Sequence, residues 1–177
     1  ASKYSFERYN FDGNEKIIVV DGVNDPTIFN TSLTASDVTD SSVEGAKFVA
    51  AFKNHMFYAG MSSTPQAIVF SEGLNEDGFS SGASLPAGSI KVDDTIVGLK
   101  AFRGELFVFC ENRIFKITGS SGSGSDVFSV TPVTRNIGCV NGDTIQEFAG
   151  DLIFLGPDGL RTVAGTARIG DVELGTI

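Results

Sequence analysis

Apolar residues in this chain come in short runs, and turn-forming residues separate one run from the next. Each run covers only a handful of positions, as in Leu106–Cys110. No long segment spaces its apolar residues at the 3.6-residue period of an amphipathic helix. Short runs bounded by turn residues are typical of β-strands. The pattern therefore predicts an all-β chain made of many short antiparallel strands.

One of these runs recurs in nearly the same form. Its pattern is a Phe, any residue, Asn or Gly, a polar residue, and then four mostly apolar positions. Three clear copies and a weaker one with an insertion follow it: Phe52–Ala59, Phe102–Phe109, Phe148–Leu155 and the weaker Phe11–Val20. The four Phe residues stand 41, 50 and 46 positions apart. A turn and a second apolar run follow each copy, so each unit is predicted as three strands with a looser fourth.

The repeat predicts how the units pack. Asn or Gly after the Phe can take the positive φ that a tight hairpin needs. The nearly continuous apolar run that follows indicates a strand covered on both faces. One unit cannot cover itself, but units packed face to face around an axis can. Four strands at a period near 45 residues are typical of a β-propeller. A β-sandwich or barrel shares the short strands but does not predict the matching motif.

We therefore predict one domain over residues 1–177, with β-propeller-like antiparallel sheets in about four units at 1–44, 45–92, 93–139 and 140–177. Because most propellers have more than four blades, a partial ring or arc fits as well as a closed ring. The chain is expected to be a processed product or a piece of a longer one. Phe52, Phe102 and Phe148 are expected to be equivalent and largely buried.

Polar stretches connect the predicted strands. Asn30–Glu44 and Asn75–Ser89 are predicted to be long surface linkers, and Ser120–Ser125 a flexible loop. Val127–Val130 is a candidate for the fourth strand of the third unit. Such loops are where we expect the protein to make its contacts.

Composition excludes several classes of protein. The 177 residues carry a net charge of −9, and an acidic chain binds nucleic acid phosphates poorly. No apolar run approaches the roughly 20 residues that span a bilayer. A hydrophobic content of 41% is too high for a disordered segment. The sequence thus predicts neither direct nucleic-acid binding nor membrane insertion.

Candidate chemistry is sparse. His55, in a predicted hairpin turn, is interpreted as a solvated turn residue, and a single His cannot build a His-based metal cluster. Cys110 and Cys139 are expected to be buried, reduced and unpaired. No nucleophile-elbow or nucleotide-binding motif is present.

Acidic pairs are the remaining candidates for a metal site. Asp93-Asp94 and Glu76-Asp77 could offer oxygen ligands to calcium, and Asp12–Glu15 resembles part of an EF-hand loop. The full loop with its terminal Glu is absent. We predict no catalytic, cofactor-binding or metal site.

The fourth unit holds the most specific stretch of sequence. It contains Asn136–Val140, then Asp143–Ile145, then Gly150–Arg161 with its Leu-Gly-Pro-Asp-Gly-Leu-Arg ending. This segment resembles a pattern common in virion structural proteins of tailed bacteriophages, including cyanophages. It is similar to the β-propeller tail proteins of the nozzle or tail tubular protein B type, over roughly residues 45–177. Those proteins are usually much longer than this chain.

The resemblance implies a non-enzymatic component of the phage tail, located in the virion, that uses no cofactor. It further implies contacts with other tail proteins and homo-oligomers around the tail axis. Two alternatives stay open. One is a sugar- or surface-binding, lectin-like propeller, although such proteins rely on exposed Trp and Tyr, and this chain has no Trp and 3 Tyr. The other is an enzyme on a propeller scaffold.

Overall fold

Four antiparallel sheets make up the computed structural model, which describes residues 3–11, 13–120 and 128–165. Sheet 1 contains β1 Ser5–Tyr9, β2 Lys16–Val20, β3 Thr27–Asn30 and β4 Ala35–Asp37. Sheet 2 contains β5 Phe48–Phe52, β6 His55–Ala59, β7 Ala67–Phe70 and β8 Gly88–Lys91. Sheet 3 contains β9 Ile96–Phe102, β10 Glu105–Cys110, β11 Ile114–Gly119 and β12 Phe128–Thr134. The 3₁₀ turn η1 Gly142–Thr144 leads into sheet 4, with β13 Gln146–Phe148, β14 Asp151–Gly156 and β15 Gly159–Thr162.

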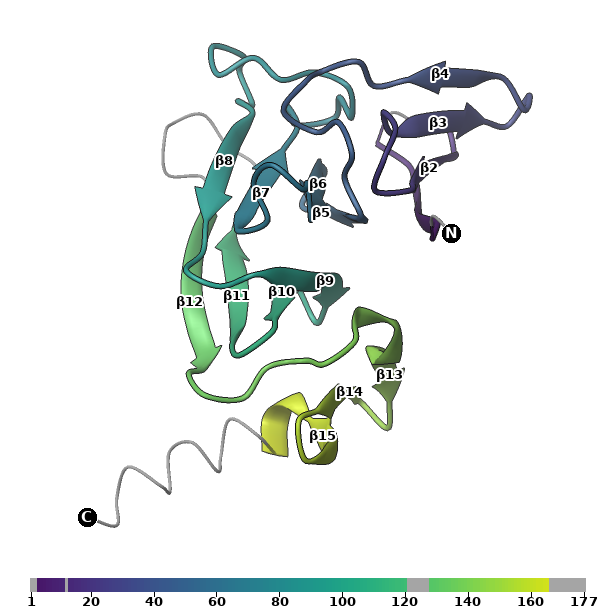
Figure 1. Cartoon of the computed structure of the whole chain (residues 1–177). Coiled ribbons are helices and arrows are strands. Elements are labelled where there is room, and N and C mark those ends of the chain that lie inside the picture. The colour runs from purple at the N-terminus through teal and green to yellow at the C-terminus, as the bar shows by residue number, and fades with distance from the viewer. Residues whose placement is uncertain (1–2, 12, 121–127, 166–177) are drawn as a thin grey trace.

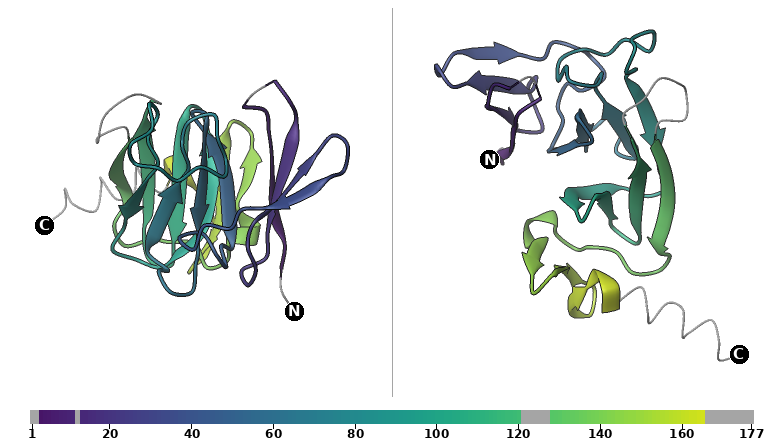
Figure 2. Two further views of the ribbon diagram at one scale, coloured as in Figure 1. Left: turned by 90° about the horizontal axis from the view of Figure 1, so that it is seen from above. Right: turned by 180° about the vertical axis from the view of Figure 1, so that it is seen from behind.

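The sheets fan around a common axis and form an arc. Each sheet is a meander whose strands lie in sequence order. Figure 1 shows the arc opening on one side, with β5, β9 and β13 on its inside and β8 and β12 on its outside. The other two views of Figure 2 show the same stacking of sheets from above and from behind. The inner strand β5 contacts both β1 and β9. The arrangement is all-β, as predicted, and the four described sheets do not close a ring.

The repeated motif forms the first hairpin of sheets 2, 3 and 4. In each sheet the Phe pairs with the residue three positions later. Both residues of the turn have positive φ, as the tightest hairpin turns require: Lys53 (50°) and Asn54 (64°), Arg103 (50°) and Gly104 (79°), and Ala149 (48°) and Gly150 (79°). The equivalence of Phe52, Phe102 and Phe148 is confirmed.

Sheet 1 departs from the predicted alignment. Its first hairpin closes at the pair Tyr9–Lys16, and Phe11 lies in the longer turn between them. Tyr9 is therefore the counterpart of the repeated Phe, and the predicted Phe11 alignment is wrong by two residues. The inserted turn residues hid the true register from sequence comparison.

Neighbouring sheets pack face to face and enclose three apolar cores. We call the face of a sheet that points toward the preceding sheet its leading face, and the opposite one its trailing face. Between sheets 1 and 2, Ile18 and Val20 pack with Met56 and Tyr58. The core between sheets 2 and 3 gathers the trailing residues Phe52, Phe57 and Phe70 with the leading residues Leu106, Val108 and Ile117. Phe107 and Phe109 pack with Leu152 and Phe154 between sheets 3 and 4.

Burial of the repeated Phe falls along the chain, which corrects one prediction. Phe52 is 6% exposed and Phe102 is half-buried, but Phe148 is 65% exposed. All three side chains lie on trailing faces. Phe52 and Phe102 are covered by the next sheet, whereas no described sheet follows sheet 4. The three Phe residues hold equivalent positions in their sheets. Phe148 is more exposed because no described sheet covers it.

The predicted linkers contain more structure than expected. The segment 30–44 includes β4 and buries Val38 and Val43 in the core between sheets 1 and 2. The segment 75–89 runs into the start of β8. β12 begins at Phe128, so the candidate fourth strand is present from that residue onward. The Ser/Gly loop at 121–125 and Val127 lie outside the described residues.

Candidate functional site

The trailing face of sheet 4 is apolar and exposed. Strand alternation places Phe148, Ile153 and Leu155 on it, and Leu160 of β15 joins them because it pairs with Leu155. Leu160 is 70% exposed, and Ile153 is half-buried. On the opposite face, Leu152 and Phe154 are fully buried against sheet 3. Sheet 4 thus has two apolar faces, of which one is covered in the described chain.

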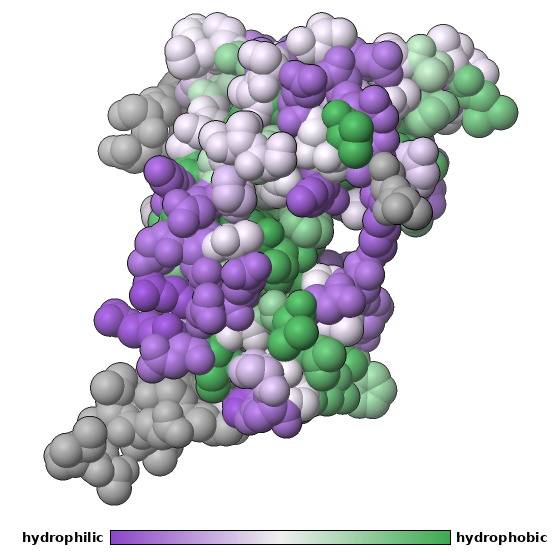
Figure 3. All heavy atoms as spheres, viewed as in Figure 1, coloured by the Kyte–Doolittle hydropathy of each residue, from purple (hydrophilic) through white to green (hydrophobic). Residues whose placement is uncertain are grey.

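The leading face of sheet 1 has the same character at the other end of the arc. Phe6, Ile17 and Val19 lie on it, with Phe29 of β3 beside Ile17. Phe6 is 71% exposed, and Ile17 and Phe29 are also exposed. Apolar residues accordingly gather at both ends of the arc in Figure 3. Soluble proteins rarely leave contiguous apolar surface open unless it contacts something.

The exposed residues occupy positions that are buried elsewhere in the same chain. Counted from the repeated hairpin, Ile153 is the counterpart of Phe57 and Phe107, which lie in covered trailing faces. Ile17 of sheet 1 is likewise the counterpart of Met56, which is fully buried in the leading face of sheet 2. Both end faces therefore carry the residues of a sheet-to-sheet contact and have no described partner sheet.

One polar contact recurs where a trailing face meets a leading face. At the first junction, the Ala51 backbone N–H donates to Glu7 Oε1 at 3.3 Å. At the third junction, Lys100 Nζ lies 3.3 Å from Glu147 Oε1. Glu7 and Lys100 each stand two residues before the aromatic residue that closes the first hairpin of their sheet. Ala51 and Glu147 hold the place one residue before it. The inner strands thus meet in the same register at the first and third junctions.

A hollow of about 880 Å³ lies near the inside of the arc, between the start of sheet 1 and the turn that precedes sheet 4. Charged residues of both signs line it: Lys3, Lys47, Asp21, Glu111 and Asp143. The backbone N–H group of Asn24, and that of Val23 to a lesser degree, hydrogen-bond Asp21 and lower the pKa of its carboxyl group. Among its described lining residues there is no His or Cys. The hollow therefore offers a surface of mixed polarity.

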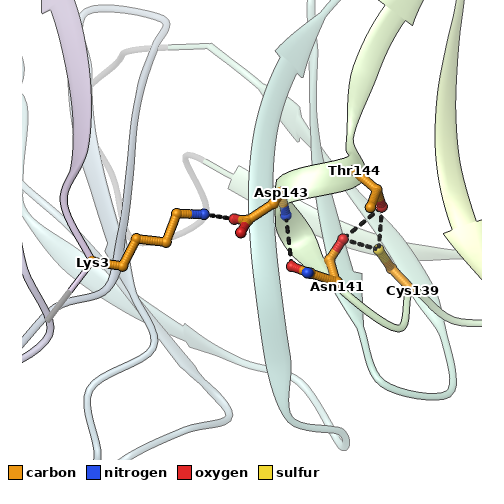
Figure 4. A network of polar contacts seen from close by, with 5 residues as sticks. All are labelled: Lys3, Cys139, Asn141, Asp143 and Thr144. Carbon is orange, nitrogen blue, oxygen red and sulfur yellow. Dashed lines mark hydrogen bonds and ion pairs between the residues drawn. The ribbon is translucent and has the colours of Figure 1, made fainter. Parts of the chain in front are cut away.

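A polar network crosses this hollow near the axis (Figure 4). Lys3 forms an ion pair with Asp143, whose backbone N–H donates to Asn141 Oδ1 at 3.0 Å. Thr144 Oγ1 donates to Asn141 O at 2.6 Å and accepts the Leu155 N–H at 3.0 Å. Both partners of the ion pair are about half exposed, so it stabilises the fold by at most about 1 kcal/mol. The network links the start of sheet 1 to sheet 4.

Gly138, in the fourth-unit motif, and Gly142, between its first two segments, allow this part of the chain to pass close to sheet 3. A Cβ at Gly138 would lie 2.3 Å from the backbone of Glu111, and one at Gly142 would lie 1.9 Å from Val97 O. This stretch of the fourth unit therefore has a structural role, since it brings the chain from sheet 3 to sheet 4.

His55 is not the solvated turn residue that the sequence suggested. It is fully buried, and its Nδ1 lies 2.7 Å from Ser71 O. The rings of Phe70 and Phe128 stand edge-on to it at 5.8 and 5.1 Å. Burial lowers the pKa of His55, and the Ser71 contact partly opposes that shift. The side chain points along the trailing face of sheet 2, where β12 of sheet 3 covers it.

Three of the candidate calcium ligands, Asp93, Asp94 and Glu76, make hydrogen bonds or ion pairs with other residues. Asp94 accepts the backbone N–H groups of Thr95 at 2.9 Å and Asn112 at 2.7 Å. Asp93 pairs with Arg113. Glu76 is buried and lies 2.8 Å from Lys16 Nζ. Within residues 3–11, 13–120 and 128–165, no three His, Cys, Asp or Glu side chains gather in a way that could hold a metal ion.

Both cysteines are buried and unpaired, which confirms the sequence prediction. Burial raises the pKa of Cys110 to about 12, and the nearby Asp94 adds to the shift. Burial also raises the pKa of Cys139. In the described part of the chain, no helix has the length and apolar character needed to cross a bilayer.

No protein-family model matches this sequence, and no curated protein matches it either. Among solved structures, the chain is similar to BBS1N, a β-propeller domain, in a crystal structure with ARL6DN soaked with lead. That match has a TM-score of 0.50 and 11% identity, and it covers 89% of this chain and 48% of BBS1N. A mercury-soaked crystal of the same complex gives a TM-score of 0.48 at 9% identity, with 90% and 49% covered.

The likeness confirms the β-propeller fold predicted from the repeat. This chain spans about half the length of the propeller domain that it matches. Four sheets in an open arc agree with that fraction. The exposed end faces, however, were not foreseen from the sequence.

Proposed function

We propose that this chain is a non-enzymatic assembly module that binds protein neighbours through the leading face of sheet 1 and the trailing face of sheet 4. The observation that carries the proposal is that these two apolar faces hold the residue types and register of the buried sheet-to-sheet contacts. A surface built like a covered interface is best explained by a partner that covers it. The crystal complex of BBS1N with ARL6DN adds that a propeller of this shape can bind a protein.

The setting that we propose is the tail of a bacteriophage particle, where the chain is a structural component of the virion in contact with other tail proteins. The resemblance of the fourth unit supports this setting. The net charge of −9 supports it too, because an acidic wall does not retain DNA that passes by.

Mass spectrometry of gradient-purified phage particles tests the setting. We expect the chain to be present in particles at a fixed ratio to other tail proteins, and to stay with tails after heads are removed. Its presence in infected-cell lysate together with absence from particles would contradict the assignment.

The lectin-like alternative is less well supported. Its exposed aromatic residues would have to line a sugar site, but Phe6 and Phe148 lie on opposite end faces of the arc. Phe48 is the one aromatic residue among the described lining of the central hollow. A glycan array with the purified chain distinguishes the two functions, and binding that is lost on Phe48→Ala would favour the lectin.

A further inference from the structure

We propose that the outer edge of β8 is a docking site for an extended segment of a partner protein, which adds to sheet 2 as a further strand and places one apolar side chain in a groove beside it. The site lies on sheet 2, whose neighbours on both sides, sheets 1 and 3, belong to the described chain. It therefore adds a contact at the rim to the end faces of the proposed function. The inference rests on that function only in taking the partner to be a protein of the same assembly.

The backbone of β8 is open on its outer side. β8 is the last strand of sheet 2 and lies on the outside of the arc (Figure 1). The Val92 N–H donates to Gln66 O at 3.0 Å, next to β7. Because successive N–H groups of a strand point to opposite sides, that of Ile90 also faces β7. Those of Ser89 and Lys91 face outward, both residues are exposed, and no described residue accepts from these two groups.

The chain itself already pairs with the start of this edge. Ala87, two residues before Ser89, donates its outward-facing N–H to Ser80 O at 3.1 Å. The edge is therefore shaped to accept a backbone laid along its outer side. Beyond Ala87, the outward positions of Ser89 and Lys91 are left for another chain.

The outer strands of sheets 1 and 3 carry features that hinder such pairing. β4 has three residues and ends in Asp37. β12 contains Pro132, which has no N–H to donate, and its pairing with β11 shifts register between Ile114 and Phe115. β8 has no Pro, and its pairing with β7 has no register shift. Natural sheets use Pro, bulges and charges to keep their edges from pairing, so the less protected edge of β8 suits a strand-like partner.

A groove of about 410 Å³ lies beside this edge. Ser89 pairs with Val69 of β7, so both side chains lie on the leading face of sheet 2, and both line the groove. Its apolar lining comes from Ala67, Val69, Phe79 and Ala87, and most of the remaining lining residues carry hydroxyl groups. No charged residue is among its described lining. The groove therefore suits an uncharged, apolar side chain.

Antiparallel pairing predicts the sequence pattern of the partner. The partner residue paired with Ser89 points to the leading face, next to the groove, and should be apolar. The partner residue two places earlier lies opposite Lys91 and should be Asp or Glu, because the Lys91 ammonium group is exposed and has no described ion-pair partner. The expected segment is Asp or Glu, any residue, and then Leu, Ile, Val or Phe. Main-chain hydrogen bonds with alternate side chains in pockets are a known mode of peptide recognition.

A second copy of the chain fits this edge less well than a single extended segment. β8 of a second copy would bring its own Ser80 backbone to the short open stretch at Ser89 and Lys91. It would also bring a second Lys91, and like charges across paired strands oppose the pairing. We therefore assign the edge to one extended segment.

An NMR titration of the chain with synthetic nine-residue peptides of the expected pattern tests the site. We expect the amide signals of Ser89 and Lys91 to shift as peptide is added. Ser89→Pro removes the outward N–H and spares the bonds between β7 and β8, because an edge strand tolerates Pro where the N–H faces solvent. It should weaken binding at least tenfold. Ser89→Ala is the matched control, which keeps the N–H and should bind like the wild type.

A charge exchange tests the predicted pairing without a change to the backbone. Peptides with Lys in place of the acidic residue should bind the wild type several-fold more weakly than peptides of the expected pattern. Lys91→Glu should reverse this preference. Peptides with Asp in place of the apolar residue should bind both forms weakly, because the groove then receives a charge.

Four outcomes would overturn the edge site. They are no shift at Ser89 and Lys91 with any peptide of the pattern, equal binding by Ser89→Pro and Ser89→Ala, a charge preference that Lys91→Glu leaves unchanged, and a dimer of the chain that Ser89→Pro abolishes. The last would show that a second copy occupies the edge. The proposed function fails separately, if the chain is absent from phage particles, and it stands if the chain is present there but none of the peptides binds.

Discussion

The contrast between Phe52 and Phe148 yields a quantitative test of the open arc. Both residues close the first hairpin of their sheet and lie on its trailing face. Phe52 is 6% exposed and contacts the rings of Phe57 and Phe128 at 5.9 and 6.0 Å. Phe148 is 65% exposed. Truncation of each to Ala therefore perturbs the same place in two different environments.

The magnitude follows from the buried surface. A Phe side chain that is fully buried hides about 200 Å², worth about 5 kcal/mol at 25 cal/mol per Å². Nearly all of this area is buried at Phe52. Measured Phe→Ala changes in protein cores cost about 3 to 5 kcal/mol of stability. Only about a third of the Phe148 side chain is buried, so Phe148→Ala should cost about 1 to 2 kcal/mol. The half-buried Phe102 should fall between the two.

Urea unfolding followed by far-UV circular dichroism measures these differences, since the chain lacks Trp. The protein should be dilute, at about 1 µM or below, so that association contributes little. The slope of the transition should stay unchanged while the midpoint moves. Equal losses for Phe52→Ala and Phe148→Ala in dilute solution would refute the view that sheet 4 ends the arc with an open face.

Three further predictions concern the interior. Gly138→Ala should destabilise the chain by about 2 kcal/mol or more in urea titrations, because its Cβ would overlap the Glu111 backbone, whereas Gly82→Ala, whose Cβ would lie 3.7 Å from Ser80 Oγ, should be nearly neutral. Burial raises the pKa of Glu7 above 4.5, so its contribution to stability is complete below that pH and is lost as the pH rises through the folded value. Glu7→Gln should gain stability relative to wild type between pH 4.5 and neutrality, unlike the exposed control Glu44→Gln; a constant difference would contradict this. Cys110 and Cys139 should resist a thiol reagent at about pH 8 until urea unfolds the chain, and a mass two daltons low before reduction would show that they pair.

The sequence was informative where local chemistry decides the structure. The hairpin at Phe52, Phe102 and Phe148 could be found because Asn54, Gly104 and Gly150 mark a turn with positive φ. The period of the motif then indicated sheets packed around an axis. These features depend on residues a few positions apart, so one sequence suffices to reveal them.

Features that depend on distant neighbours could not be predicted in this way. His55 looks like its counterparts Glu105 and Asp151, yet Phe128 of the next sheet covers it. Phe148 looks like Phe52, yet no described sheet covers it. Burial at these positions is decided by whether a following sheet is present, and the motif carries no information about that.

Site-specific photo-crosslinking tests the central claim most directly. A photo-reactive residue in place of Phe148, on the exposed trailing face of sheet 4, should cross-link the chain to a protein neighbour in intact phage particles. The same residue in place of Leu33, in the exposed β3–β4 turn, is the control and should give little of that product. Equal cross-linking from the two positions, or none from Phe148, would contradict the account.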